Sequence, residues 1–333
     1  MKWEIAKLGD ISKNIQTGPF GSQLHQSDYS ECGIPVVMPK DLVGGKISEE
    51  SIARVDKTHV ERLCRHKIEV GDILYSRRGD VGRCAHVTKK EEGWLCGTGC
   101  LRVTIDSEKA DSRFVFFQLQ HPDTVGWVEK HAVGATMLNL NTTILSSVPI
   151  RLPALEIQKR IADILSAYDD LIENNQKQIK LLEEAAQRLY KEWFVDLRFP
   201  RHENTRIVDG VPEGWNWCKL EDAIQFDPKV TLTKERMKQF IPMSALSTSS
   251  MVLDESQFTE TTSNSGSKFQ NGDTLLARIT PCLENGKTAY VSGLKSDEGA
   301  VGSTEYIVMR AKTINAYMVY LLERTDDFRQ SAI

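Results

Sequence analysis

Between residues 155 and 194 the chain places apolar side chains in alternating steps of three and four, with no glycine and no proline. Such steps put side chains on one face of an α-helix, and their repetition over five heptads is typical of a coiled coil. A helix of about 40 residues would be roughly 60 Å long. The positions expected to pack against a partner are Ile161, Leu165, Tyr168, Ile172, Asn175, Ile179, Leu182, Leu189 and Trp193.

Two features qualify this interpretation. Asn175 is the polar member of the series, and such a residue often sets the register of a coiled coil, although it can also simply be tolerated. The alternative is one amphipathic helix lying on its own domain. Its length disfavours this, because the helix would overhang a domain of about 150 residues. Pro153 lies at the start of the predicted helix, where proline is common in the first turn.

Outside this segment the pattern changes to short β-branched runs bounded by glycine and aspartate. Such runs are typical of strands and turns, and examples are Pro35–Met38, Ile73–Ser76 and Leu101–Ile105. The segment after Ser112 has the pattern of a helix with an aromatic face. This mixture predicts a domain of mixed α/β structure.

The same succession occurs twice along the chain. Trp3–Asp10 is echoed by Trp215–Asp222. Further echoes follow in the same order: Ile34–Met38 with Ile241–Met243, Val70–Leu74 with Asn271–Leu275, Gly97–Gly99 with Gly302–Thr304, and Phe114–Leu119 with Tyr317–Leu322. Five echoes in one order indicate an internal repeat. The predicted fold class is therefore α+β, with two similar mixed α/β domains (1–153 and 212–333) separated by a long coiled-coil-type helix (154–199) and a linker (200–211).

Composition is consistent with two globular domains. The 333 residues are 40% hydrophobic and 26% charged, with a net charge of −4, which excludes a uniformly basic protein but not local basic surfaces. The sequence shows no run long enough to span a membrane and no apolar segment of a secretory signal at its start. Seven cysteines form a sparse, odd set, as expected of reduced thiols in the cytoplasm.

A basic segment of the first domain is the main candidate for binding an anionic partner. Residues 65–90 hold seven lysines or arginines against three carboxylates. Within it, Arg77 and Arg78 follow a predicted strand and precede a glycine, so two guanidinium groups are expected at the rim of a loop. Guanidinium groups suit phosphate and guanine recognition. In the alternative interpretation, Asp80 or Glu69 neutralises one of the two arginines.

Other loops carry short polar side chains or a rigid turn. Gly18–Gln23 predicts an exposed turn. In the second domain, the loop 277–287 corresponds to the Arg77–Arg78 loop and keeps its framework but changes the side chains. Plain turns would explain the same residues. Two similar domains joined by a helical spacer would suit two DNA half-sites. The predicted DNA-contacting residues are Ser22, Gln23, Lys40, Ser76, Arg77, Arg78, Arg83, Thr98, Thr136, Asn139, Asn141, Arg278, Thr280, Asn285 and Lys287.

The motifs of several enzyme classes are missing from the sequence. There is no Pro-Pro dipeptide for an adenine methyltransferase loop, no carboxylate pattern of a common nuclease, and no phosphate-binding loop for ATP. The spacing of Cys84, His86, Cys96 and Cys100 is poor for zinc, so core thiols are the expected interpretation. The chain is predicted to be non-catalytic and to bind no metal or cofactor.

The chain resembles the specificity subunit of type I restriction-modification systems. The resemblance rests on nine segments: Trp3–Ile11, Thr17–Ser22, Gly33–Pro35, Gly71–Gly79, Leu138–Leu140, Val148–Pro153, Leu155–Ala162, Trp193–Asp196 and Pro212–Trp215. It implies two target recognition domains that read a bipartite site on double-stranded DNA. It also implies a spacer helix that helps to bind modification (methyltransferase) subunits, with restriction subunits in the full complex. S-adenosylmethionine, ATP and Mg²⁺ would then be bound by those partner subunits. The remaining alternative is a coiled-coil scaffold with two protein-binding domains.

The sequence departs from that family in its second half. Ile333 corresponds to about Lys130 of the first copy, so the second domain is expected to be incomplete and to have no second helix. The apolar stripe of the spacer would then lack a partner within the chain. We expect a second copy of the chain or a modification subunit to cover it.

Overall fold

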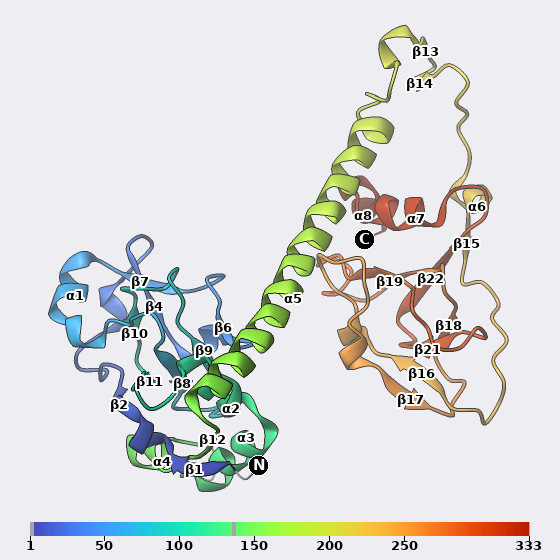
Figure 1. Ribbon diagram of the computed structural model, residues 1–333. Helices are drawn as coiled ribbons and strands as arrows, with labels where there is room; N and C mark the ends of the chain where they lie inside the picture. The colour runs from blue at the N-terminus through green and yellow to red at the C-terminus, as the bar shows by residue number, and fades with distance from the viewer. Residues whose placement is uncertain (1–2, 135–137, 333) are drawn as a thin grey trace. The chain divides into compact units, whose positions relative to one another are not determined.

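The computed structural model describes residues 3–134 and 138–332. The chain divides into two compact units, Met1–Ile172 and Glu173–Ile333. The division falls inside one long helix, α5 (Leu155–Tyr190), so each unit contains part of that helix (Figure 1).

The first unit is built on a sheet of order β2-β11-β8-β9. The central strands β8 (Ile73–Ser76) and β11 (Cys100–Ile105) pair antiparallel. All four residues of β8 are buried, and alternate residues of β11, from Leu101 to Ile105, enter the main core. The edge strands are β2 (Ser12–Thr17) and β9 (Cys84–His86). Two of the runs predicted as strands are therefore strands, and β11 begins one residue earlier than expected.

A second sheet of the first unit has the order β10-β4-β7-β3. Its strands are β10 (Leu95–Cys96), β4 (Ile34–Val37), β7 (Ala53–Val55) and β3 (Tyr29–Ser30), with β10 parallel to β4. A hairpin of β5 (Leu42–Val43) and β6 (Lys46–Ile47) and the short helix α1 (Lys57–Arg62) complete this side. The strand predicted at Pro35–Met38 is thus present as β4.

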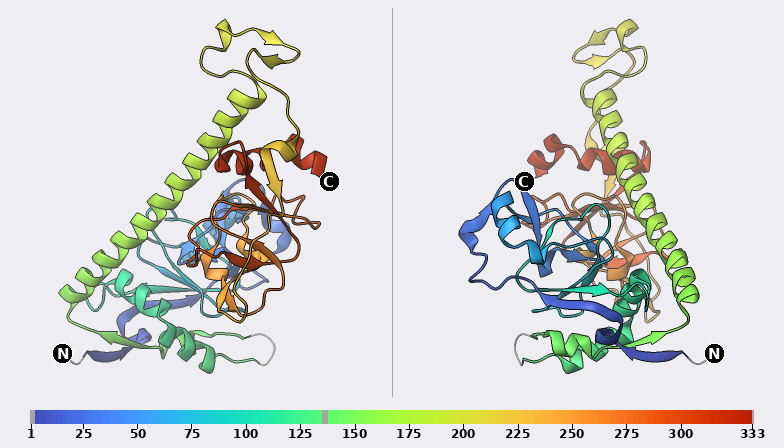
Figure 2. Two further views of the ribbon diagram at one scale, coloured as in Figure 1. Left: turned by 90° about the vertical axis from the view of Figure 1, so that its right-hand side faces the viewer. Right: turned by 60° about the vertical axis from the view of Figure 1, so that its left-hand side comes forward.

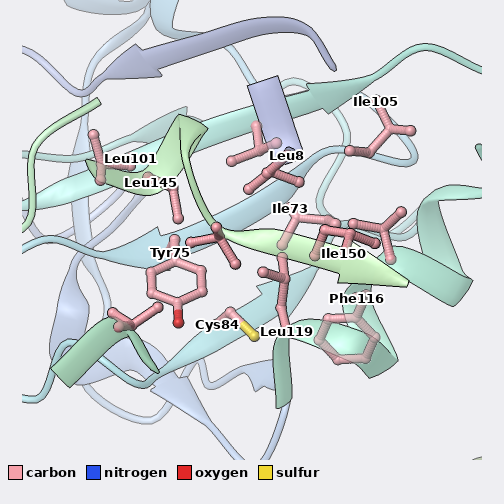
Figure 3. Close-up of a cluster of buried hydrophobic side chains, with 14 of the residues drawn as sticks. Leu8, Ile73, Tyr75, Cys84, Leu101, Ile105, Phe116, Leu119, Leu145 and Ile150 are labelled. Atoms are coloured by element: carbon pink, nitrogen blue, oxygen red, sulfur yellow. The ribbon is translucent and has the colours of Figure 1, made fainter. Parts of the chain in front are cut away.

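Helices α2 (Ser112–Gln120), α3 (Pro122–His131) and α4 (Thr142–Ser146) complete the main core. The Asp111 carboxylate caps α2 by accepting from the backbone N–H groups of Arg113 and Phe114. Figure 3 shows the tightly packed core, in which Leu8, Tyr75 and Leu145 are all completely buried.

The two ends of the first unit meet in a two-stranded ladder. β1 (Glu4–Lys7) pairs antiparallel with β12 (Pro149–Leu152), with Ala6 opposite Ile150. The backbone N–H of Leu8 also donates to the carbonyl of Val148, at 2.9 Å. β12 then leads into α5, as Figure 2 shows. The last strand of the unit thus holds its first strand in place.

Helix α5 is anchored in the first unit by a buried glutamine. The Gln158 side chain is 2% exposed. Its Oε1 accepts from the N–H of Asp111 at 3.0 Å, and its Nε2 donates to the carbonyl of Pro153 at 2.8 Å. Among the predicted stripe positions, Ile161 and Trp193 are half-buried and the other seven are exposed. Exposed fractions among them reach 62% at Tyr168 and 70% at Leu182.

The second unit repeats the architecture of the first. Its main sheet has the order β15-β22-β19-β20, which matches β2-β11-β8-β9, and its second sheet has the order β17-β16-β21-β18. In that second sheet β16 runs parallel to β21, as β4 does to β10. The elements are β15 (Ile224–Phe226), β16 (Lys238–Ile241), β17 (Thr259–Thr261), β18 (Ser267–Phe269), β19 (Thr274–Ala277), β20 (Thr288–Tyr290), β21 (Ala300–Gly302), β22 (Tyr306–Ala311), α6 (Leu220–Ala223), α7 (Ala316–Glu323) and α8 (Asp326–Ala332).

A buried aspartate confirms the register of the repeat. In the first unit the Asp72 carboxylate accepts from the Thr104 hydroxyl at 2.6 Å. In the second unit the guanidinium of Arg310, at the equivalent place on β22, donates two hydrogen bonds to Asp273, at 2.6 and 2.8 Å. The repeat predicted from the sequence is therefore a structural repeat. The predicted α+β class, with two similar units and a long helix, is confirmed.

A small aromatic cluster follows α5 in the second unit. Phe194, in a short π-helical turn (Lys191–Val195), and Phe199, which follows that turn, pack their rings on Trp215, with centroids 5.7 and 5.3 Å from the Trp215 ring. A hairpin of β13 (Ile207–Val208) and β14 (Val211–Pro212) lies between Phe199 and Trp215 in the sequence. No helix of the described residues is long and apolar enough to cross a bilayer.

Candidate nucleic-acid interface

The loop that follows β8 in the first unit presents the predicted arginine pair. The Arg77 backbone N–H donates to the Gly99 carbonyl at 2.8 Å, and the Leu140 N–H donates to the Arg77 carbonyl at 2.8 Å. Arg78 forms an isolated antiparallel bridge with Asn139. The loop backbone is therefore held from two sides, so its side chains project from a defined position.

The charges of this loop are largely uncompensated. Among the residues that the structure describes, neither Arg77 nor Arg78 forms an ion pair with a carboxylate. Asp80 instead pairs with Arg83, with Nε and Oδ2 2.6 Å apart. The alternative in which Asp80 or Glu69 neutralises Arg77 or Arg78 is therefore wrong. The exposed Arg78 guanidinium is free to meet an anionic or hydrogen-bond-accepting ligand.

Ser76 occupies a different place from the one its predicted role needs. It is the last residue of β8 and is completely buried. Its hydroxyl donates to the Arg78 carbonyl at 3.1 Å. Because the side chain points into the protein, Ser76 positions the arginine loop and does not reach a base edge.

The predicted turn at 18–23 lies beside the same loop cluster. The Gly18 N–H donates to the Cys100 carbonyl at 2.9 Å, and the Thr98 hydroxyl donates to the Pro19 carbonyl at 3.0 Å. A Cβ on Gly18 would lie 2.0 Å from the Gly97 carbonyl oxygen, so only glycine fits there. The structure thus brings together the loops that contain Pro19, Arg77 and Thr98, which are far apart in sequence.

The rim of this turn is open. Ser22 is exposed. Gln23 is half-buried, and its Oε1 accepts from the Phe20 N–H at 3.2 Å. Sequence reasoning missed Phe20 itself, whose ring is 56% exposed. The exposure of Phe20 was predictable, because an aromatic ring inside a Gly-Pro-Phe-Gly turn belongs to no strand or helix whose buried face could cover it.

The remaining predicted DNA-contacting residues of the first unit differ in whether their polar groups are free to meet a ligand. The Lys40 ammonium is exposed, but it donates to the carbonyl and the hydroxyl of Ser51 at 2.5 and 3.0 Å. Asn139 is half-buried beside Arg78. The Asn141 side chain caps α4 by accepting from the Ile144 N–H at 2.8 Å. Thr136 lies outside the described residues.

The second unit presents a differently charged loop on the same framework. Cys100 pairs with Ser76 in the first unit, and Tyr306 pairs with Ala277 in the second, so Gly99 and Glu305 are equivalent. Each accepts a backbone hydrogen bond from the arginine after the strand, Arg77 or Arg278. The Glu305 carboxylate also pairs with the Arg278 guanidinium at 3.1 Å. The second unit therefore compensates an arginine charge that the first leaves open.

The other second-unit candidates lie around that pair. Thr280 and Asn285 are exposed, and the Thr280 hydroxyl approaches the Glu284 carboxylate at 3.4 Å. The Lys287 ammonium donates to the Met243 carbonyl at 3.0 Å. This surface mixes carboxylates and amides with cations, so it can both donate to and accept from a ligand.

Buried titratable groups lie behind these loops. Burial raises the pKa of Asp72, although its hydrogen bonds oppose the shift. Burial, with the nearby Arg65 and Arg102 charges, lowers the pKa of His66 to about 4. Burial also raises the pKa of the Cys84 and Cys96 thiols to about 12. The described residues contain no cluster of metal-ligating side chains. These groups are core components, and the exposed loops hold the chemistry available to a ligand.

The fold defines a class: two repeated mixed α/β units, each ending a central strand in a polar loop, with a long helix between them in sequence. The S subunit of the type I restriction-modification system from M. genitalium has this fold, with a TM-score of 0.60 and 15% identity. The match covers 99% of this chain and 79% of that one. The family model of the type I restriction modification DNA specificity domain matches residues 1–184. The chain belongs to that family.

Two specificity subunits are among its relatives. The MjaIX specificity subunit of Methanocaldococcus jannaschii is 28% identical over 233 residues, which are 68% of this chain and 52% of that one. The HindI specificity subunit of Haemophilus influenzae is 27% identical over 213 residues, which are 63% of this chain and 44% of that one. The chain thus spans about half the length of these relatives.

Proposed function

We propose that this chain is the DNA-reading subunit of a type I restriction-modification complex. The observation that carries the proposal is the rigid loop cluster of the first unit, with its uncompensated Arg78, in a chain that belongs to the specificity-domain family. Arginine in a fixed loop suits bidentate contact with guanine or a phosphate. The exposed Phe20 ring adds an apolar surface to the same loop cluster.

In this proposal the chain reads sequence and supplies no reacting group. Residues 1–153 and 212–333 act as recognition domains, with 154–199 as spacer and 200–211 as linker. The complex works in the cytoplasm, and modification and restriction subunits bind S-adenosylmethionine, ATP and Mg²⁺. The apolar stripe of α5 supports a further part of the proposal, in which a helix from a second copy or a modification subunit packs on it.

Reconstitution tests this function directly. The chain, its cognate modification subunits and S-adenosylmethionine are incubated with a DNA library, and methylated adenines are mapped. We expect methylation confined to one recognition sequence and dependent on the chain. The Arg78→Ala chain should relax that sequence at one position. Methylation that proceeds equally without the chain would contradict the proposal and favour a scaffold role.

A further inference from the structure

The first unit presents an aromatic ring on a closed turn. The Phe20 carbonyl accepts from the Gln23 N–H at 2.8 Å, and the Gln23 Oε1 accepts from the Phe20 N–H at 3.2 Å. A Cβ added to the next residue, Gly21, would have nothing but its chain neighbours within 4 Å. The turn therefore holds Phe20 in a defined place beside open space.

The framework of the fold does not require this exposure. β15 of the second unit corresponds to β2, because the two are the same edge strand of main sheets with matching order. The segment after β15 buries its apolar residues: Val230 and Leu232 are 8% and 6% exposed and cluster with Val301. The segment after β2 instead leaves Phe20 56% exposed. The exposed ring is thus a property of the first unit alone.

The position of the ring relates it to the candidate nucleic-acid interface. A single exposed apolar side chain is ordinary by itself. The turn of Phe20 and the loop of Arg78, however, are hydrogen-bonded through their backbones to two consecutive residues, Cys100 and Gly99 respectively. Both therefore project from the same end of the main sheet, and a ligand that meets the Arg78 guanidinium also meets the ring.

The chemistry of DNA limits what an apolar ring can recognise there. The base edges of the major groove carry hydrogen-bonding groups and one kind of apolar group, the C5 methyl of thymine. An aromatic wedge between two base pairs would need both faces of its ring free. Phe20 is 56% exposed, so the protein covers much of the remainder of the residue. Contact with a methyl group requires only one open side.

We propose that Phe20 reads the 5-methyl group of a thymine and so determines one base pair of the recognised sequence. This inference rests on the proposed function, in which Arg78 contacts a base in the same groove. β2 and β8 flank β11, so the ends of these two strands lie two strand spacings apart, about 9.6 Å. At a rise of about 3.4 Å per base pair, the thymine lies about three base pairs from the base that Arg78 contacts.

Uracil tests the contact, because it pairs as thymine does but lacks the methyl group. The full chain with its cognate modification subunits is titrated with its preferred duplex, in which each thymine in turn is replaced by uracil. Fluorescence anisotropy measures the binding. One replacement, about three base pairs from the position that Arg78→Ala relaxes, should weaken binding about fourfold, the effect of exposing one buried methyl group. The other thymines of that half-site should tolerate the replacement.

Variants of the turn assign the effect to the ring. In the Phe20→Ala chain the sensitive replacement should lose its effect, while discrimination at the base that Arg78 contacts persists. Phe20→Leu keeps an apolar side chain and should keep the sensitivity to uracil. Val43→Ala is the matched control, since Val43 is 55% exposed but lies on the hairpin strand β5, and it should behave as the original chain.

Three results would overturn the inference. The first is sequence-specific binding in which no uracil replacement matters. The second is a sensitivity that persists in the Phe20→Ala chain, which would assign the methyl contact to another residue. The third is equal weakening of the Phe20→Ala chain on every duplex, which would make the ring a non-specific contact. All three leave sequence-specific binding intact, whereas binding without any sequence preference would contradict the proposed function and this inference together.

Discussion

At the scale of single residues, the two units differ in whether a carboxylate pairs with the arginine that follows the central strand. Gly99 leaves the first-unit arginines without a carboxylate, whereas Glu305 pairs with Arg278. A guanidinium that is already paired must exchange its partner before it can bind a ligand. The first unit is therefore expected to contribute more to DNA affinity than the second.

Arg78→Ala tests the open guanidinium. If Arg78 reads guanine, binding of the preferred DNA should weaken by roughly 1–3 kcal/mol and specificity should relax at one position. Arg83→Ala is the matched control, because Asp80 already neutralises Arg83 in the same loop. Gel-shift titrations with the preferred DNA and single-base variants measure both. Uniform weakening on every DNA would identify Arg78 as a phosphate contact instead.

Glu305→Gln tests the compensated guanidinium. The substitution keeps the size of the side chain and removes its charge, so Arg278 gains freedom to meet a phosphate. We expect tighter binding to DNA at low salt. The plot of log binding constant against log salt should also steepen by about one unit, as for one added phosphate contact. An unchanged slope would mean that the Arg278 loop lies away from the DNA.

A buried carboxyl in the second unit predicts a pH dependence of stability. Glu323 is 1% exposed and accepts one hydrogen bond from Thr288, and burial raises its pKa well above the usual 4.5. The unfolded chain loses this proton at lower pH than the folded chain. The free energy of unfolding should therefore fall as pH rises above about 4.5.

Glu323→Gln removes that titration. The variant should lose less stability than the original chain between pH 5 and pH 8, as measured by urea unfolding of the full chain followed by circular dichroism. The Glu323→Gln chain is expected to be the more stable of the two at pH 8, because it buries no ionisable carboxyl there. Parallel pH profiles for the two chains would show that Glu323 is charged in the folded unit.

At the scale of elements, the helix and its anchor illustrate what could be predicted from the sequence. The heptad pattern predicted α5 well, since a 36-residue helix depends on local periodicity. The burial of Gln158 could not be predicted in the same way, because its partners Asp111 and Pro153 are set by the fold of the whole first unit.

The candidate site was likewise only partly predictable from the sequence. The exposure of Arg78 was predictable from a strand followed by a glycine turn. The convergence of Pro19, Arg77 and Thr98 was not, because hydrogen bonds between distant segments create it. Ser76 is buried because all four residues of β8 are buried, and only the packing of the whole unit on both faces of that strand defines this. Local pattern thus predicted the elements, and long-range pairing decided which polar residues reach the surface.

Gln158→Ala tests the anchor of α5. The substitution leaves a backbone donor at Asp111 and an acceptor at Pro153 without their partner, inside the protein. Loss of stability of about 1–3 kcal/mol is expected. Gln178→Ala, on an exposed position of the same helix, should cost less than about 0.5 kcal/mol. Urea unfolding of both variants measures the difference, and equal effects would mean that the anchor is not needed.

At the scale of the whole molecule, the exposed stripe of α5 predicts association. Leu165, Tyr168, Ile172, Ile179, Leu182 and Leu189 are each at least 38% exposed. Exposed apolar side chains in heptad steps are usually covered by another helix. Association through this stripe would join two copies of the chain or bind a modification subunit, and these two outcomes make separable predictions.

Leu182→Asp places a charge in the middle of the stripe. If copies of the chain pair through α5, light scattering should give the mass of a dimer for the original chain and of a monomer for the Leu182→Asp chain. The control is Met237→Asp, which places the same charge on an exposed apolar residue outside α5 and should leave the mass unchanged. If the original chain is monomeric, the stripe is assigned to a modification subunit. Leu182→Asp should then abolish co-purification with that subunit while leaving DNA binding by the first unit intact. A variant that keeps both associations would show that the stripe is not an interface.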